Sequence, residues 1–126
     1  MDEIFKDILG YEGLYQVSNL GNVKRLASYR GKGKGYLVDE HLIKPSINSR
    51  GYQHIGLCKN GKVKTFNIHR LVATAFIDNP DGKPEVDHID RNKTNNCVNN
   101  LRWATRSENN YNRVFKEKNN NNREKR

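Results

Sequence analysis

The first half of the chain alternates short apolar runs with glycine and asparagine, which is typical of antiparallel strands joined by tight turns. Residues 15–18 are apolar at alternate positions and read as a strand, and residues 23–26 return the chain after the turn-forming residues 19–22. We therefore predict a first hairpin there. The basic, glycine-rich stretch at 30–35 is expected to be a flexible loop outside the core.

Residues 52–58 and 63–68 predict a second hairpin, because an Asn-Gly pair at 60–61 lies between them. Asn-Gly is the strongest short hairpin signal, since both residues tolerate a positive φ. The spacing of apolar residues then changes. In residues 69–77 they fall on one face of a helix, which predicts a helix ended by the turn-forming residues 79–82.

The last patterned segment contains two short apolar runs and the start of a helix. Residues 86–89 and 101–104 are expected to form two strands or extended segments. Thr105 and Glu108 match a capping box, in which two side chains satisfy the first backbone donors of a helix. This part of the chain should therefore fold as strand, loop, strand and helix.

Composition narrows the partner to a polyanion. The 126 residues suffice for one domain or two small modules that share a core, and their formal net charge is +9. Lysine and arginine favour nucleic acid or an anionic surface, because they release counterions from phosphates. Residues 113–126 contain six basic and two acidic residues, so they carry +4 and the rest carries +5. This asparagine-rich tail is expected to be disordered.

Cysteine use and hydropathy predict an intracellular protein without membrane contact. The two cysteines, Cys58 and Cys97, form no CxxC pair, so a four-cysteine zinc site is excluded. Free thiols in a reducing cytoplasm are the expected state. No apolar run approaches the roughly 18–20 residues of a membrane span. The acidic residues 1–6 also lack the core of a signal peptide.

Candidate chemistry is concentrated in the last patterned segment. Asp87 and His88 place a hard metal ligand beside a potential general base. Neighbouring side chains on a strand point to opposite faces, so both serve one site only if the strand ends or twists there. Asn100 precedes the second strand and Asn109 lies on the capped helix. An amide can ligate a hard cation or hold a loop, and a solvated, asparagine-rich turn is the structural alternative.

These residues resemble a known motif. Residues 87–90 (Asp-His-Ile-Asp), residues 99–105 and Asn109 are similar to the HNH nuclease motif, in the variant with asparagine in place of the last histidine. Residues 68–76 resemble the phage homing-endonuclease branch of that superfamily. Residues 5–24 resemble the DNA-binding module that these enzymes carry.

The resemblance implies an α+β fold. A small N-terminal antiparallel β-sheet module would precede a ββα-metal finger and a disordered basic tail. The implied domains are an N-terminal DNA-binding module at residues 1–58, an HNH nuclease domain at 59–112 and the tail at 113–126.

The resemblance also implies a function, which is metal-dependent cleavage of DNA. The expected enzyme is of the nicking or homing type and is encoded by a phage or mobile element. Asp87 and Asn109 match the metal ligands of the family. His88 matches the general base that activates water, and Asn100 matches the residue that fixes the catalytic loop. The expected cofactor is one Mg²⁺ or Mn²⁺ ion per site, and the expected partner is double-stranded DNA. If the gene belongs to a phage, the expected location is the cytoplasm of the host cell.

Three other residues have both a functional and a structural interpretation. His69 begins the predicted helix and is a candidate supporting residue of the site, with a local hydrogen bond as the alternative. His41, expected in a loop, and Trp103, expected in the core of the finger, are given structural roles.

The basic residues of the predicted strands and the glycine-rich loop are candidate phosphate contacts, with a solvated surface as the alternative. Tyr29, Tyr36 and Tyr52 lie among them and offer faces on which bases could stack. At position 91 many relatives have glycine, and the arginine here is expected to reshape the loop or add a phosphate contact. The candidate DNA-contacting residues are Lys24, Arg25, Arg30, Lys32, Lys34, Lys62, Lys64, Arg91 and Arg102.

Two other functions stay open at this point. A DNA-binding or regulatory protein with a vestigial HNH finger would share the basic surface and lack a catalytic residue, and none is missing here. An RNA nuclease or nucleic-acid chaperone would use the same surface on single-stranded RNA. We expect a monomer, which favours nicking, and a dimer that cuts both strands is the alternative.

Overall fold

The computed structural model describes residues 1–31, 33 and 35–110. Within this part the chain forms antiparallel sheets, the helix α1 and a helical segment at residues 106–110, so the predicted α+β class is confirmed. The tail at 113–126, predicted to be disordered, lies outside the described residues. Among the described residues, no helix has the length and apolar character needed to cross a bilayer.

The N-terminal sheet has four strands in the order β1-β2-β3-β6, with every neighbouring pair antiparallel. β2 (Tyr15–Ser18) and β3 (Val23–Arg25) confirm the first predicted hairpin. β1 (Phe5–Asp7) and β6 (His41–Ile43) were not predicted, because neither of these short segments shows an alternating apolar pattern. The placement of His41 in a loop was therefore wrong.

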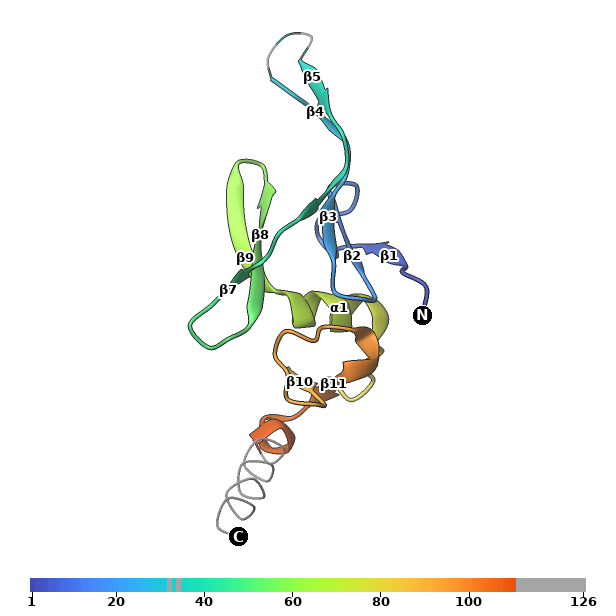
Figure 1. Cartoon of the computed structure of the whole chain (residues 1–126), viewed down its shortest axis with the longest axis vertical. Coiled ribbons are helices and arrows are strands. Elements are labelled where there is room, and N and C mark those ends of the chain that lie inside the picture. Colours follow the sequence, from blue (N-terminus) through green and yellow to red (C-terminus); the bar gives the residue numbers. More distant parts are fainter. Residues whose placement is uncertain (32, 34, 111–126) are drawn as a thin grey trace.

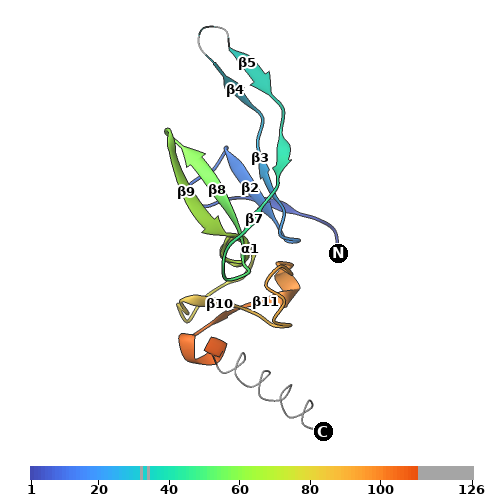
Figure 2. The same cartoon turned by 60° about the vertical axis from the view of Figure 1, so that its left-hand side comes forward.

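A separate hairpin surrounds the glycine-rich stretch. β4 (Ser28–Arg30) pairs with β5 (Tyr36–Val38), and both views show this hairpin standing away from the rest of the protein (Figures 1 and 2). Tyr29 and Tyr36 are exposed on it. The described residues of the intervening loop contribute nothing to the core, as predicted.

The third sheet has the order β7-β8-β9. β8 (Gln53–Lys59) and β9 (Lys62–Asn67) pair along their length, and β7 (Ser46–Ile47) adds a short edge. Asn60 and Gly61 both have positive φ, 52° and 74°, as a two-residue hairpin turn requires. The second predicted hairpin is confirmed. This hairpin spans the boundary predicted between the modules at residues 58 and 59. Strands from both predicted modules therefore belong to one sheet.

Helix α1 (Ile68–Phe76) follows β9 directly and confirms the predicted helix to within one residue at each end. It lies between the N-terminal sheets and the C-terminal strands (Figure 1). Its buried side chains contribute to one hydrophobic cluster with residues from β2, β8 and both C-terminal strands. Because a single core spans the chain, the N-terminal half can hold the C-terminal half in a fixed position. Core members from these elements include Tyr15, Val17, Ile55, Leu57, Ile68, Val72, Val86 and Leu101.

The C-terminal unit pairs β10 (Glu85–His88) with β11 (Leu101–Ala104), joined by a loop and the short helix η1 (Val98–Asn100). Trp103 packs against the core and donates from Nε1 to the Ile77 carbonyl at 2.9 Å, which agrees with its predicted role in the core. Residues 106–110 are helical. Strand, loop, strand and helix thus follow in the predicted order.

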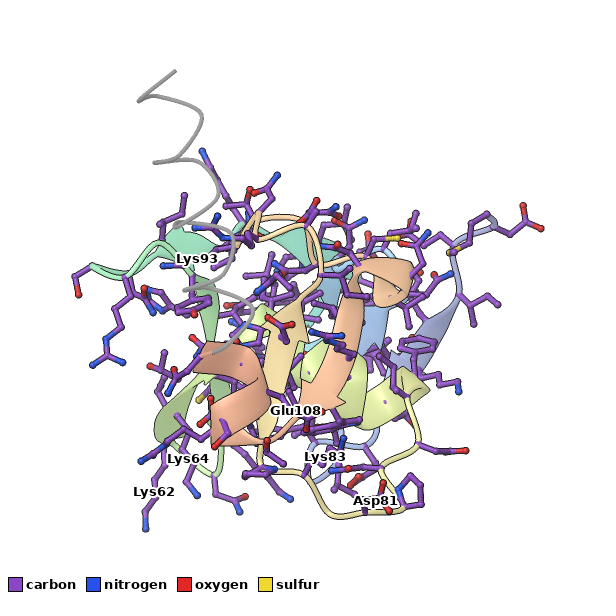
Figure 3. The ribbon with its side chains drawn as sticks, turned by 90° about the horizontal axis from the view of Figure 1, so that it is seen from below. Lys62, Lys64, Asp81, Lys83, Lys93 and Glu108 are labelled. Atoms are coloured by element: carbon purple, nitrogen blue, oxygen red, sulfur yellow. The ribbon has the colours of Figure 1, made fainter. Side chains whose placement is uncertain are left out.

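The predicted capping box is confirmed. The backbone N–H of Glu108 donates to Oγ1 of Thr105 at 3.1 Å, and the N–H of Thr105 donates to Oε1 of Glu108 at 3.0 Å. Glu108 also pairs with Lys83 at 3.0 Å, and Figure 3 shows these two side chains next to each other. The Thr105 N–H, with Lys83 beside it, lowers the pKa of Glu108 to about 2. This box fixes where the last helix starts, and so where Asn109 lies.

Candidate active site

Strand β10 presents its side chains to two opposite faces. Its register with β11 places Glu85 and Asp87 on one face and Val86 and His88 on the other. β10 ends at His88, and the chain turns at once, since the Arg91 N–H donates to the His88 carbonyl at 2.9 Å. The carboxylate of Asp87 and the imidazole of His88 therefore point to opposite faces of β10. A substrate could approach both side chains only at the end of this strand.

Asp87 is buried on the first face, with 5% of its surface exposed. Its Oδ2 accepts a hydrogen bond from Nε of Arg102 at 2.9 Å, and Nη2 of Arg102 forms an ion pair with the same oxygen at 2.9 Å. A buried carboxylate is costly without such a partner. Arg102, a candidate DNA contact, thus directs its guanidinium at Asp87.

Asn109 reaches the same face from the last helix. Its Nδ2 donates to Oε1 of Glu85 at 2.9 Å, and this bond lowers the pKa of Glu85. Because Nδ2 is the donor, the carbonyl Oδ1 is the atom that Asn109 can offer to a metal. Glu85 was missed as a candidate residue, although its position two residues before Asp87 puts it on the same face of a strand.

The oxygen atoms on this face of β10 are suitable ligands for a hard cation. A carboxylate from Asp87 and an amide oxygen from Asn109, with Glu85 beside them, are the oxygen ligands that Mg²⁺ and Mn²⁺ favour. Among the described residues, no three His, Cys, Asp or Glu side chains form a ready metal cluster. Asp87 and Asn109 would supply two oxygen ligands and leave the remaining coordination positions to water, as Mg²⁺ prefers.

His88 is buried on the second face. Its Nε2 lies 2.8 Å from Oδ1 of Asn96, and its ring centroid lies 4.9 Å from that of His69 and 5.9 Å from that of Tyr52. Burial lowers the pKa of His88, while Asn96 and Asp87 act in the opposite direction. His88 is therefore neutral at pH 7, and a neutral imidazole can accept a proton.

His69, on α1, lies behind His88. It is 6% exposed, and its ring centroid is 5.0 Å from that of Tyr52. Burial, reinforced by the nearby His88 and Arg70, lowers the pKa of His69 to about 3. Within the described part of the chain, Nδ1 of His69 has no hydrogen-bond partner. The side chain thus packs as a neutral ring against His88.

Asn100 closes the loop between β10 and β11. Its Oδ1 accepts from the Asp90 N–H at 3.0 Å, and its Nδ2 donates to Oδ1 of Asp90 and to the Asn95 carbonyl, both at 2.9 Å. Hydrogen bonds from Asn95, Asn92 and Asn100 lower the pKa of Asp90. The ionised Asp90 and Asn100 thus hold the loop that directly follows His88.

The candidate DNA contacts divide into engaged and exposed side chains. Arg25 turns inward and donates from Nη1 to the Tyr15 hydroxyl at 2.8 Å. Lys24 pairs with Glu40 at 3.1 Å and lies over the Phe5 ring. These two residues stabilise the N-terminal sheet, which leaves less of their charge for a phosphate.

Besides Arg102, which pairs with Asp87, three of the described candidates are exposed. Arg30 lies on the projecting hairpin. Lys62 and Lys64 lie two residues apart on β9, and Figure 3 shows both side chains extending to the same side. Lys32 and Lys34 lie outside the described residues.

Arg91 occupies a special backbone position. Its φ is +66°, in the left-handed region, and its side chain is half-buried. Glycine adopts this conformation without strain, whereas a side chain costs about 1 kcal/mol or more. The turn after His88 thus favours glycine over a residue with a side chain at position 91.

Comparison with known proteins identifies the family. The model described as "HNH endonuclease" matches residues 67–111, and the model described as "NUMOD4 motif" matches residues 3–58. The chain belongs to the HNH endonucleases of the phage homing type, as its sequence motifs indicated.

Its relatives include DNA endonuclease I-HmuI of Bacillus phage SP01, which is 48% identical over 101 residues, 80% of this chain and 52% of that protein. H-N-H endonuclease F-TflII of Escherichia phage T5 is 36% identical over 69 residues, 53% of this chain and 36% of that protein. A solved structure titled "DNA binding and cleavage by the HNH homing endonuclease I-HmuI" matches with a TM-score of 0.70 and 44% identity, over 90% of this chain and 59% of the other. The chain therefore spans about half the length of I-HmuI.

Proposed function

We propose that the chain is a metal-dependent DNA endonuclease that hydrolyses phosphodiester bonds. The observation that supports this most is the arrangement at the end of β10. A buried, neutral His88 occupies one face of the strand. Asp87 lies on the opposite face together with Glu85, to which Asn109 is hydrogen-bonded. The similarity to I-HmuI, whose structure is titled for DNA binding and cleavage, supports the same reaction.

Each group has a role that its chemistry allows. Asp87 and Asn109 would hold one Mg²⁺ or Mn²⁺ ion, which when bound neutralises charge on the scissile phosphate and the leaving oxygen. His88 accepts the proton of the attacking water. Asn100 keeps the loop after His88 in place. Because Asp87 and His88 point apart, the phosphate should lie beyond the end of β10, where both are within reach.

The basic surface supports duplex DNA as the partner. The exposed Arg30, Lys62 and Lys64 would contact phosphates, and the chain as a whole carries a net charge of +9. We propose that a monomer nicks one strand. Cys58 and Cys97 are free thiols, as suits action in the cytoplasm of a host cell.

Cleavage of supercoiled plasmid tests the proposal. We expect nicked circles with Mg²⁺ or Mn²⁺ and none with EDTA, whereas linear product would indicate cutting of both strands. H88A should lower the cleavage rate at least about 100-fold and keep DNA binding, because general bases contribute roughly 10²–10⁴-fold. H41A changes an exposed histidine on β6 and is the matched control. Cleavage by H88A at the wild-type rate would refute the role of His88.

One observation favours the rival function of a non-catalytic DNA-binding protein. Arg102 already pairs with Asp87, so a metal would have to share that carboxylate. Tight binding of duplex DNA with no metal-dependent nicking under any condition would establish this rival. Preference for single-stranded RNA over duplex DNA in a competition assay would instead establish the RNA-directed function.

A further inference from the structure

Two polar side chains, Asn96 and Gln53, connect the N-terminal half of the protein to His88. Oδ1 of Asn96 lies 2.8 Å from Nε2 of His88, and Nδ2 of Asn96 donates to Oε1 of Gln53 at 2.9 Å. Asn96 is only 3% exposed. Gln53 belongs to β8, 43 residues earlier in the chain. The mechanism described above gives Asn96 no role.

The atom that faces His88 determines which ring nitrogen carries the proton. A carbonyl oxygen can only accept, so Nε2 of His88 must be the donor. In a neutral imidazole the other nitrogen, Nδ1, then holds the lone pair. Gln53 accepts from Nδ2 of Asn96 and so keeps the amide oxygen of Asn96 turned toward the ring.

The N-terminal half also fixes the backbone at Asn96. The Val98 N–H donates to the Asn19 carbonyl at 2.8 Å, which joins the loop to the turn between β2 and β3. Gly21 in that turn has a φ of +90°, and a Cβ there would lie 3.0 Å from Cβ of Asn96. Glycine permits this close approach. Tyr52, next to Gln53, stacks on the His88 ring at an angle of 26°.

We propose that Asn96 is the positioning residue of His88. Supported by Gln53 and the turn at Gly21, it orients the imidazole and keeps Nδ1 as the nitrogen that takes the proton from water. The N-terminal half would thereby hold the general base as well as contact DNA. This inference rests on the proposed function only through the role of His88 as base.

Kinetics of plasmid cleavage with the whole chain give the first test. N96A should lower kcat about tenfold or more and leave KM unchanged, because the base is misoriented while DNA binding persists. N96D should recover most of the activity, since a carboxylate still accepts from Nε2. Q53A should have a smaller effect in the same direction. The control N99A removes an exposed asparagine of η1 and should match the wild type.

Nuclear magnetic resonance of ¹⁵N-labelled histidine gives a readout that does not depend on cleavage. The spectrum contains four histidines, and the His88 signals are those missing from H88Q. In neutral His88 the wild type and N96D should show Nε2–H, whereas N96A should show a mixture with Nδ1–H. Wild-type kcat and an unchanged tautomer in N96A would overturn the proposal.

The outcomes separate this inference from the proposed function. If H88A cleaves normally while the tautomer still changes in N96A, the base assignment fails and the positioning contact stands. If N96A does not fold, N96D decides, because a folded N96D that has lost both kcat and the Nε2–H tautomer would overturn the inference.

Discussion

Asn109 donates from Nδ2 to Oε1 of Glu85 at 2.9 Å and so joins the last helix to β10 across 24 residues of chain. The capping box at Thr105 starts that helix, and this bond sets where its first turn lies against the strand. With Nδ2 engaged, the amide of Asn109 has one defined orientation. The bond also lowers the pKa of Glu85, which keeps this acceptor ionised at neutral pH.

The first prediction concerns Glu85 itself. E85A should weaken Mg²⁺ binding about tenfold, because residues that orient a metal ligand typically contribute 10–100-fold to affinity. E85Q keeps an oxygen acceptor for Asn109 and should bind Mg²⁺ more tightly than E85A does. Isothermal titration of each purified variant with Mg²⁺ measures this. Equal affinity of E85A and the wild type would show that Asn109 needs no support from Glu85.

The second prediction concerns the ion pair of Asp87 and Arg102. R102L should lower the free energy of unfolding in EDTA by about 2 kcal/mol, because the buried Asp87 loses its guanidinium partner. Mg²⁺ should restore more stability to R102L than it adds to the wild type, since the ion then compensates Asp87. Urea unfolding with EDTA or Mg²⁺ measures both effects.

The matched control is R106L, which removes the ion pair between Arg106 and Glu85, whose atoms lie 3.3 Å apart. The Arg106 side chain is 84% exposed, against 51% for Arg102, so this pair should contribute less than about 1 kcal/mol. Equal losses in R102L and R106L would argue against a special role for the Arg102 pair.

The third prediction is a pH dependence caused by His69. Its pKa is 6.5 in a solvent-exposed chain and about 3 in the folded protein, so between these values the unfolded chain binds more protons. Stability should therefore fall as the pH drops from about 6.5 toward 3, by at most about 1.4 kcal/mol per pH unit from this residue. H69F keeps an aromatic ring and removes the titration, so its unfolding free energy should fall less steeply. Identical slopes for H69F and the wild type in urea titrations would contradict this.

The fourth prediction concerns the turn that follows His88. R91G and R91A both remove the arginine side chain, so they differ only in how well they tolerate the φ of +66°. R91G should be more stable than R91A by about 1 kcal/mol, because alanine is strained in the left-handed region. Thermal unfolding of the two variants measures the difference. An R91A at least as stable as R91G would mean that the turn relaxes without cost.

Local sequence signals predicted the elements that carry the site. The Asn-Gly pair at 60–61, the helical spacing in α1 and the capping box at Thr105 each depend on residues within a few positions of one another. The structure confirms all three. The short strands β1 and β7 escaped prediction because their residues show no apolar periodicity.

The sequence by itself determined the two main hairpins, the helix α1, the strand-loop-strand-helix order of the C-terminal unit, the basic charge and the motif that contains Asp87, His88, Asn100 and Asn109. It could not show that Arg25 turns inward onto Tyr15, or that Gln53 reaches Asn96 behind His88. Such contacts join side chains 10 and 43 residues apart. They form only when the shared core brings separate elements together, so the packing of the whole chain decides them.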